Sequence, residues 1–366
     1  MIYSNNLLRR TNLALTSLQI KIRQPDDWHL HLRDGNILKA LVPHTARVFA
    51  RAIVMPNLNP PITTVEAAQN YKQRILNSIP NGSNFMPLMT AYLTDELSRD
   101  VLNYGHSIGL FTAAKLYPAN STTNSAEGVR DLRNISPLLE TMETIGMPLL
   151  IHGEVTDPAI DVFDREAIFI DRHLKSILAS YPNLRIVLEH ITTQEAVDFV
   201  ESNGPNLAAT ITPHHLQINR NAMFDGGFRS DFYCLPVAKR ERHRLALRRA
   251  ATSGKSCYFL GTDSAPHLRS AKLSSCGCAG IFNSSYALET YAEVFEEEDS
   301  LNKLEAFSSE FGPAFYGLPL NEGSIKLVKK DQIVPNYVDL GEAEGLSQKV
   351  VPFHAGDRLK WSVFNG

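Results

Sequence analysis

The sequence predicts an α/β protein, a closed (β/α)8 or TIM barrel of eight parallel strands with helical additions at its C-terminal end. Short, nearly continuous apolar runs alternate with amphipathic helical patterns, as expected for parallel strands that are buried on both faces. The alternation occurs eight times, which favours a closed barrel over an open doubly wound sheet. The chain is also long enough, because its 366 residues exceed the ~250 of a typical barrel.

The first four strand–helix units account for residues 29–145. We expect their strands, from short apolar runs, at residues 29–32, 52–55, 85–91 and 109–116. Their helices are expected at residues 37–49, 65–77, 95–103 and 127–145. Thr94 is the expected N-cap of the third helix, and Gly146 is expected to close the fourth.

The other four units complete the barrel. Their strands are expected at residues 148–152, 185–190, 207–211 and 257–260. Helices are expected at 165–180, in a short stretch capped by Thr192 or Thr193, and at 238–252. Further helices at 283–297 and 301–311, with strand-like pieces at 324–328 and 332–334, should pack against the barrel. No linker interrupts residues 24–366, so we expect a single domain preceded by an N-terminal extension, residues 1–23.

Composition narrows the class of partner. A formal net charge of −3, without a basic cluster interleaved with aromatics, argues against nucleic acid. No apolar run approaches the ~20 residues that a membrane span needs. Four cysteines in so long a chain indicate a reducing cytoplasm, and we expect Cys276 and Cys278 to be free thiols in a loop. The basic, acid-free residues 1–23 could also be a transit peptide, although a frayed extension is the preferred interpretation.

The sequence DWHLHLRDG at residues 27–35 is the first motif that indicates chemistry. In a strand, His29, His31 and Arg33 would share one face, and the apolar residues between them would share the other. Two imidazoles on one face suit a metal ion, and the guanidinium beyond them suits an anion. By itself the motif also fits a strand with two solvated histidines.

More candidate ligands stand where other strands end. They are His29 and His31 on the first strand, Lys115 on the fourth, His152 on the fifth, His190 on the sixth and Asp263 on the eighth. Barrel enzymes build their sites on this face of the sheet. A free Lys115 ammonium would repel metals, so this lysine either extends to solvent or carries carbon dioxide as an anionic carbamate. His214 and His215 could line the same pocket, whereas we take His44, His106, His173, His243 and His354 as structural or solvated.

Longer motifs then support a family resemblance. They are DWHLHLRDG at 27–35, MPN at 55–57, KLYPAN at 115–120 with TTN at 122–124, HGE at 152–154, EHITT at 189–193 and GTDSAPH at 261–267. With these motifs the chain resembles the shorter, bacterial-type dihydroorotases of the amidohydrolase superfamily, from about residue 24 to its end. No position where that family places chemistry departs from its pattern.

The resemblance implies a binuclear zinc site. One zinc would be held by His29, His31 and Asp263, and the other by His152 and His190. Carboxylated Lys115 and a hydroxide would bridge the two ions. Two such metals generate a hydroxide and polarise a carbonyl, as the opening of a cyclic amide requires. Asp263, beside that hydroxide, is the candidate that carries its proton to the leaving nitrogen.

The resemblance also implies how the substrate is held. Its α-carboxylate would be bound by Arg33, Asn57 and His267, together with backbone groups at Leu235 and Ala279. Residues 117–125, with Thr122 and Thr123, would form a mobile cover over the site. The alternative for these two threonines is an N-terminal cap for the helix expected from Glu127.

The function implied is the reversible, zinc-dependent cyclisation of N-carbamoyl-L-aspartate to dihydroorotate and water, a step of pyrimidine (UMP) biosynthesis. A homodimer is implied as well. The nearest alternative is another cyclic amidohydrolase, such as a hydantoinase or allantoinase. A neutral hydantoin, however, has no carboxylate for Arg33, Asn57 and His267. The other alternative is a scaffold that has lost the chemistry, against which the complete set of six ligands argues.

Overall fold

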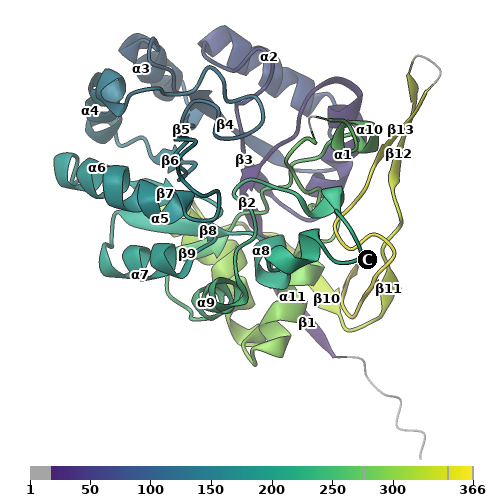
Figure 1. Cartoon of the computed structure of the whole chain (residues 1–366). Coiled ribbons are helices and arrows are strands. Elements are labelled where there is room, and N and C mark those ends of the chain that lie inside the picture. Colours follow the sequence, from purple (N-terminus) through teal and green to yellow (C-terminus); the bar gives the residue numbers. More distant parts are fainter. Residues whose placement is uncertain (1–17, 276, 344–345, 365–366) are drawn as a thin grey trace, which may run out of the picture.

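Eight parallel strands form the centre of the computed structural model, which describes residues 18–275, 277–343 and 346–364. The strands follow one another around the sheet in chain order, and helices cover its outer face (Figure 1). They are β2 (Asp26–Leu30), β3 (Arg51–Val54), β4 (Met86–Tyr92), β5 (Phe111–Leu116), β6 (Leu149–Ile151), β7 (Ile186–Leu188), β8 (Leu207–Ile211) and β9 (Tyr258–Leu260). The predicted barrel is therefore confirmed.

The barrel closes just beyond the last strand. Leu30 and Ser264 form a parallel bridge, and the amide of His31 donates to the carbonyl of Ser264 at 3.0 Å. The amide of Asp263 donates to the carbonyl of His29 at 2.9 Å. Closure therefore places candidate ligands at the carboxyl ends of the first and the last strand of the barrel next to each other.

Helices follow the strands in the expected alternation. They are α1 (Gly35–Ala46), α2 (Val65–Leu76), α3 (Arg99–Ser107), α4 (Ser136–Ile145), α5 (Arg165–Phe169), α6 (Lys175–Ser180), α7 (Gln194–Ser202), α8 (Pro213–Gln217) and α9 (Glu241–Ala251). A π-helical turn, η2 (Ile170–Leu174), joins α5 to α6. The predicted Thr193 cap of α7 is confirmed, since its side chain accepts from the amide of Ala196. Among the described helices, none is both long and apolar enough to cross a membrane.

Two predicted helix starts are wrong. Ser98, rather than Thr94, caps α3 through a hydrogen bond from the amide of Asp100. No helix begins at Glu127, because a 3₁₀ turn, η1 (Leu132–Ile135), with Asp131 as its cap, precedes α4. The chain before it folds back instead, and the amide of Val129 donates to the carbonyl of Tyr117 at 2.8 Å. A Cβ on Gly128 would lie 2.4 Å from that carbonyl oxygen, so this return of the chain requires glycine.

Two apolar cores lie on the two faces of the sheet. Residues such as Ile186 and Leu188 pack outward against the helices, whereas Val187 between them points into the barrel. Trp28 belongs to the inner core and Leu30 to the outer one. The prediction that they share a face is wrong, because a register shift against β3 between Asp27 and Leu30 interrupts the alternation. The strand also ends at Leu30, so His31 and Arg33 follow it instead of lying in it.

Helix α12 (Phe311–Tyr316) closes the barrel at the end where the strands begin. The ring of Trp28 stacks on that of Tyr316 at 4.4 Å between centroids, and Arg185, just before β7, donates to the carbonyl of Phe315 at 2.6 Å. The elements beyond β9 are α10 (Arg269–Lys272), α11 (Ala287–Glu297), η5 (Leu301–Lys303), η6 (Ala306–Glu310) and α12 (Phe311–Tyr316). The helices expected at 283–297 and 301–311 are thus present with shifted bounds.

The C-terminal additions contain strands as well as helices. These are β10 (Ser324–Val328), β11 (Gln332–Ile333), β12 (Val338–Ala343), β13 (Leu346–Val350), β14 (Arg358–Leu359) and β15 (Ser362–Phe364). Strand β1 (Gln19–Arg23) lies within the stretch expected to be an N-terminal extension and pairs with β10 in an antiparallel sheet. The β12–β13 ribbon projects from the barrel beside α10 and α1 (Figure 1).

Candidate active site

A narrow pocket opens where the carboxyl ends of the strands meet. It is lined by His31, Arg33, Asn57, Tyr117, Thr122, Thr123, His152, His190, Leu235, Asp263, Ala265, Ala279 and Gly280. Most of the residues expected at the site therefore share one pocket. His29, Lys115 and His267 do not line it, although each contacts a residue of the site, as described below.

Three candidate ligand atoms converge at the junction of β2 and β9. His29 Nε2 lies 3.2 Å from His31 Nε2. Asp263 Oδ1 lies 3.3 Å from the first of these nitrogens and 3.2 Å from the second. Burial alone would raise the pKa of the Asp263 carboxyl, but His29 and His31 hold it well below its usual range. An ionised carboxylate beside two imidazoles is a donor set that suits a divalent metal.

His152 and His190 lie next to this group. His152 follows β6, and its ring centroid is 4.9 Å from that of His190, which in turn is 4.8 Å from that of His29. His190 has a left-handed backbone, φ 43°, and its amide donates to Thr210 Oγ1 at 2.7 Å. Burial lowers the pKa of His190 well below its usual value, and its Nδ1 has no hydrogen-bond partner among the described residues. A neutral imidazole with an unpartnered nitrogen fits a metal ligand.

Lys115 is completely buried and points into the barrel, which rules out its extension to solvent. Its Nζ contacts Glu189 Oε2, and the other oxygen of Glu189 lies 2.9 Å from His29 Nδ1. Burial lowers the pKa of the Lys115 ammonium. Sequence reasoning assigned no role to Glu189, although the residue precedes His190 within one of the motifs. It connects a candidate bridging residue to a candidate ligand.

Glu166 is a second carboxylate that sequence reasoning missed. It is buried on α5 and accepts hydrogen bonds from the backbone amides and the hydroxyls of Thr192 and Thr193, at distances of 2.5 to 3.0 Å. These threonines directly follow His190, so Glu166 holds the segment that presents this histidine. In the sequence it was one acid in an amphipathic helix, without a signal that separated it from solvated ones.

Arg33 forms a cationic wall of the pocket. Its Nε donates to the carbonyl of Pro266 at 3.1 Å, and its Nη2 lies 2.9 Å from His267 Nε2. It forms no salt bridge with any residue in the described part of the chain. Its backbone is left-handed, φ 56°, and its carbonyl accepts from the Tyr71 hydroxyl at 2.8 Å. A half-buried guanidinium without a carboxylate partner is a ready site for an anionic ligand.

Residues 117–125 lie over this pocket. Asn57 Nδ2 donates to the carbonyl of Thr123 at 2.9 Å, and Asn124 Nδ2 donates to the carbonyl of Asn57 at 3.1 Å. Thr123 Oγ1 donates to the carbonyl of Ala279 at 3.3 Å. The interpretation of Thr122 and Thr123 as a helix cap is wrong, since the next helical turn, η1, starts at Leu132 and is capped by Asp131. The loop instead contacts two segments that line the pocket.

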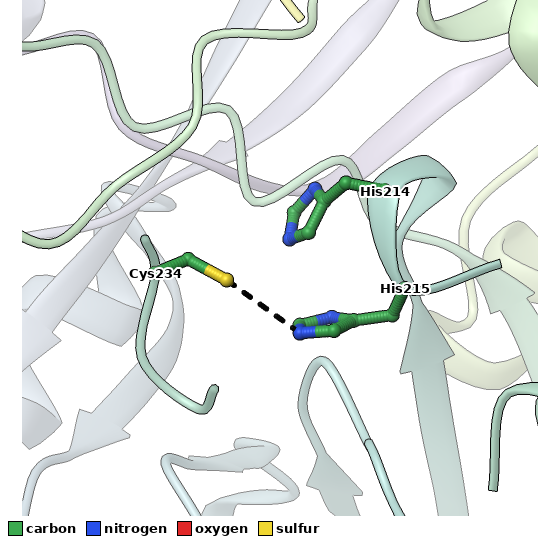
Figure 2. A group of neighbouring side chains, drawn as sticks. All are labelled: His214, His215 and Cys234. Atoms are coloured by element: carbon green, nitrogen blue, oxygen red, sulfur yellow. Dashed lines mark hydrogen bonds between the residues drawn. The ribbon is translucent and has the colours of Figure 1, made fainter. Parts of the chain in front are cut away.

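His214 and His215 do not line the pocket; they form a separate buried group with Cys234 (Figure 2). Asn283 Nδ2 donates both to the carbonyl of Thr262 at 2.8 Å and to His214 Nδ1 at 3.0 Å. His214 Nδ1 is therefore an acceptor, and the proton lies on Nε2, the nitrogen that faces Cys234 in Figure 2. Burial also raises the pKa of the Cys234 thiol to about 12. A protonated nitrogen and a protonated thiol do not favour metal binding. The expectation for Cys276 falls outside the described residues.

Comparisons with known proteins agree with this geometry. A model of the amidohydrolase family matches residues 26–333. A curated dihydroorotase from Synechococcus sp. (strain CC9902) is 64% identical over 345 residues, which are 94% of this chain and 98% of the relative. The crystal structure of dihydroorotase from Campylobacter jejuni has a TM-score of 0.87 at 36% identity, with 97% of this chain and 100% of that chain covered. An L-hydantoinase from Arthrobacter aurescens reaches 0.76 at 15% identity over 94% of this chain and 83% of its own, a likeness of fold alone.

The geometry of the cluster predicts the effect of removing a ligand. We expect His152→Ala to lower the content of tightly bound divalent metal, measured by elemental analysis, because one donor of the cluster is lost. His173→Ala is the matched control, since His173 lies in η2 and does not line the pocket, whereas His152 does. Equal metal content in the two variants would contradict the assignment of His152 as a ligand.

Proposed function

The chain belongs to the dihydroorotases of the amidohydrolase family, and from this premise we propose that it catalyses the reversible cyclisation of N-carbamoyl-L-aspartate to dihydroorotate and water. In the hydrolytic direction it is a cyclic amide hydrolase. The substrate carries a free α-carboxylate beside the group that reacts. The pocket offers a partner for each, a guanidinium for the carboxylate and the cluster of candidate ligands for the reacting carbonyl.

The observation that carries the proposal is the position of Arg33. It lines the same pocket as His31 and Asp263, and the described residues provide no carboxylate to pair with it. A half-buried charge without a counter-charge attracts an anion, so an anionic ligand would complete the pocket. A neutral hydantoin would leave the guanidinium uncompensated. No observation on the chain favours the hydantoinase alternative.

We propose that the site holds two zinc ions. His29, His31 and Asp263 would hold one, His152 and His190 the other, and Lys115 would bridge them as a carboxylated side chain. When bound, such ions polarise the reacting carbonyl and activate water at neutral pH. The burial of Lys115 supports this assignment, because its lowered pKa favours the neutral amine that reacts with carbon dioxide. The unpartnered nitrogen of His190 supports it as well.

Residues of the chain would bind the α-carboxylate and transfer the proton. Arg33 and Asn57, with His267 behind the wall, would orient the α-carboxylate, and backbone groups at Leu235 and Ala279 would complete its binding. Asp263 is ionised in the resting site because of its neighbouring histidines. In cyclisation it would accept the proton of the attacking ureido nitrogen, as that nitrogen bonds to the side-chain carboxyl carbon and water departs. In hydrolysis it would return the proton to the leaving nitrogen.

The proposal extends to the setting of the reaction. Dihydroorotate is an intermediate of pyrimidine biosynthesis, so the chain would supply that pathway. The family resemblance supports a homodimer, and the small number of cysteines supports a reducing cytoplasm. The charge balance supports a small-molecule substrate rather than a nucleic-acid partner.

The proposed role of Arg33 predicts a loss of substrate affinity on its removal. Arg33→Met should lower kcat/KM for dihydroorotate by about 10- to 100-fold, because a hydrogen bond to a charged group contributes ~1.5–3 kcal/mol. Ultraviolet absorbance follows the hydrolysis. Arg133→Met is the control, since that side chain is 90% exposed. Turnover of hydantoin or allantoin by the wild type, without turnover of dihydroorotate, would instead support the rival function.

The proposed bridge predicts that Lys115→Ala loses both metal and turnover. Small carboxylic acids should restore part of the activity, because they can supply the missing bridging oxygens. Crystals of the metal-loaded wild type should show density for a carboxyl group beyond Nζ of Lys115. An unmodified ammonium in such a crystal would contradict the carboxylation.

The proposed cover predicts that the Thr122→Val/Thr123→Val variant loses about tenfold or more in kcat, since two hydroxyl hydrogen bonds of ~1 kcal/mol each are removed. Its metal content and Tm should stay close to those of the wild type. Thr141→Val/Thr144→Val is the matched control, because both hydroxyls donate to helix carbonyls on α4. A wild-type kcat for the first variant would remove the loop from the catalytic cycle.

A further inference from the structure

Lys272, the last residue of the short helix α10, is buried below the wall of the pocket, with 6% of its surface exposed. Its ammonium donates to three backbone carbonyls, those of Tyr233 at 3.0 Å, Cys278 at 3.1 Å and Gly280 at 2.6 Å. These carbonyls belong to two segments that are distant in the sequence. The three donors of one ammonium therefore join the two segments.

Both segments contribute backbone to the pocket. Leu235 follows Tyr233 by two residues, and Ala279 lies between Cys278 and Gly280; Leu235 and Ala279 both line the pocket. A direct bond from the amide of Gly280 to the carbonyl of Tyr233, at 3.0 Å, also connects the segments. The ammonium thus sets the distance between the two backbone groups proposed to receive the substrate.

The segment around Ala279 also contacts His267, the neighbour of Arg33 at the pocket. His267 Nε2 lies 3.0 Å from the carbonyl of Ala279 and 2.9 Å from Arg33 Nη2. Thr123 of the covering loop also donates to the carbonyl of Ala279. A shift of Ala279 would therefore displace His267 and Thr123, which contact its carbonyl, and with them Arg33 and the covering loop.

The need to fill this space does not by itself explain a lysine at this position. Burial lowers the pKa of Lys272 to about 8, which reflects the cost of holding a charge away from water. In the described part of the chain, no carboxylate forms a salt bridge with it. An apolar side chain would fill the same space without that cost, but it could not hold three carbonyls.

We propose that Lys272 is a positioning residue that fixes the Leu235 and Ala279 segments at the separation required to bind the carboxylate of the substrate. The inference rests on the proposed function. Lys272 does not line the pocket, so it acts through these segments and not by contact with the substrate.

The test compares two lysines that bind backbone carbonyls in different places. Lys272→Met removes the three donors and keeps a stem of similar length. Lys303→Met is the matched control, because Lys303 Nζ donates to the carbonyls of Thr252 at 2.8 Å and Ser253 at 3.2 Å, near the start of β9 and away from the pocket. The measurements are KM and kcat for dihydroorotate, together with metal content and Tm.

We expect Lys272→Met to raise KM by about tenfold or more, to change kcat by less than about threefold, and to retain the wild-type metal content. Lys303→Met should keep the wild-type KM whatever its effect on Tm. Lys272→Arg should also raise KM, because a planar guanidinium cannot direct donors at three carbonyls arranged around one ammonium. This variant keeps the charge, so it also serves if Lys272→Met does not fold.

A wild-type KM in Lys272→Met or in Lys272→Arg would overturn the positioning role, and so would an equal rise in KM in the Lys303→Met control. Each of these results leaves the proposed function intact, since the wild type would still turn over dihydroorotate. Failure of the wild type to hydrolyse dihydroorotate would overturn the proposed function and this inference with it.

Discussion

The arrangement of the site depends on the pairing of one buried carboxylate, that of Glu189. It is 1% exposed, and its two oxygens contact His29 Nδ1 after the register shift of β2 and Lys115 Nζ on β5. Because a buried carboxylate is stable only when it is paired, these contacts are needed wherever Glu189 is ionised. A carboxylate this close to Nδ1 attracts a proton to that nitrogen, and Nε2 lies on the side of Asp263. Glu189 therefore positions His29 toward Asp263 and, while Lys115 is unmodified, holds its amine in the barrel.

A second set of buried polar residues supports the segments that follow the strands. Asp27 accepts from the amide and hydroxyl of Thr262, Glu166 accepts from Thr192 and Thr193, and Lys272 donates to three carbonyls. Each of these contacts lies within a few residues of a residue that lines the pocket. Arg33, His190 and Asp263 all have left-handed backbones, which cost about 1–3 kcal/mol each in residues other than glycine. The supporting hydrogen bonds offset this strain, so the side chains are held before any ligand arrives.

Two of the three local errors of the sequence-based predictions have a common origin. The helix expected from Glu127 starts at Leu132 as a 3₁₀ turn, because the preceding residues return to Tyr117 and bond to its carbonyl. Trp28 faces the barrel interior, because a register shift against β3 interrupts the alternation that the pattern implied. Ser98 displaced Thr94 as a cap, although both have the side chain for that role. In the first two cases a contact outside the local window decided between conformations of similar propensity, whereas the Ser98 cap is itself a local hydrogen bond, from the amide of Asp100.

The sequence by itself determined the eight-stranded barrel, the resemblance to the family and most of the pocket-lining residues. Apolar runs and helical periodicity are local properties, and a parallel barrel necessarily gathers the carboxyl ends of its strands on one face. The tertiary structure alone decided how buried charges are paired. Glu166 and Lys272 have no periodicity or spacing that separates them from solvated acids and bases, and the motif that contains Glu189 does not say what its carboxylate contacts. Their roles arise from partners that are brought together only when the barrel closes, because the pairing of a charge is a property of distance in space and not of position along the chain.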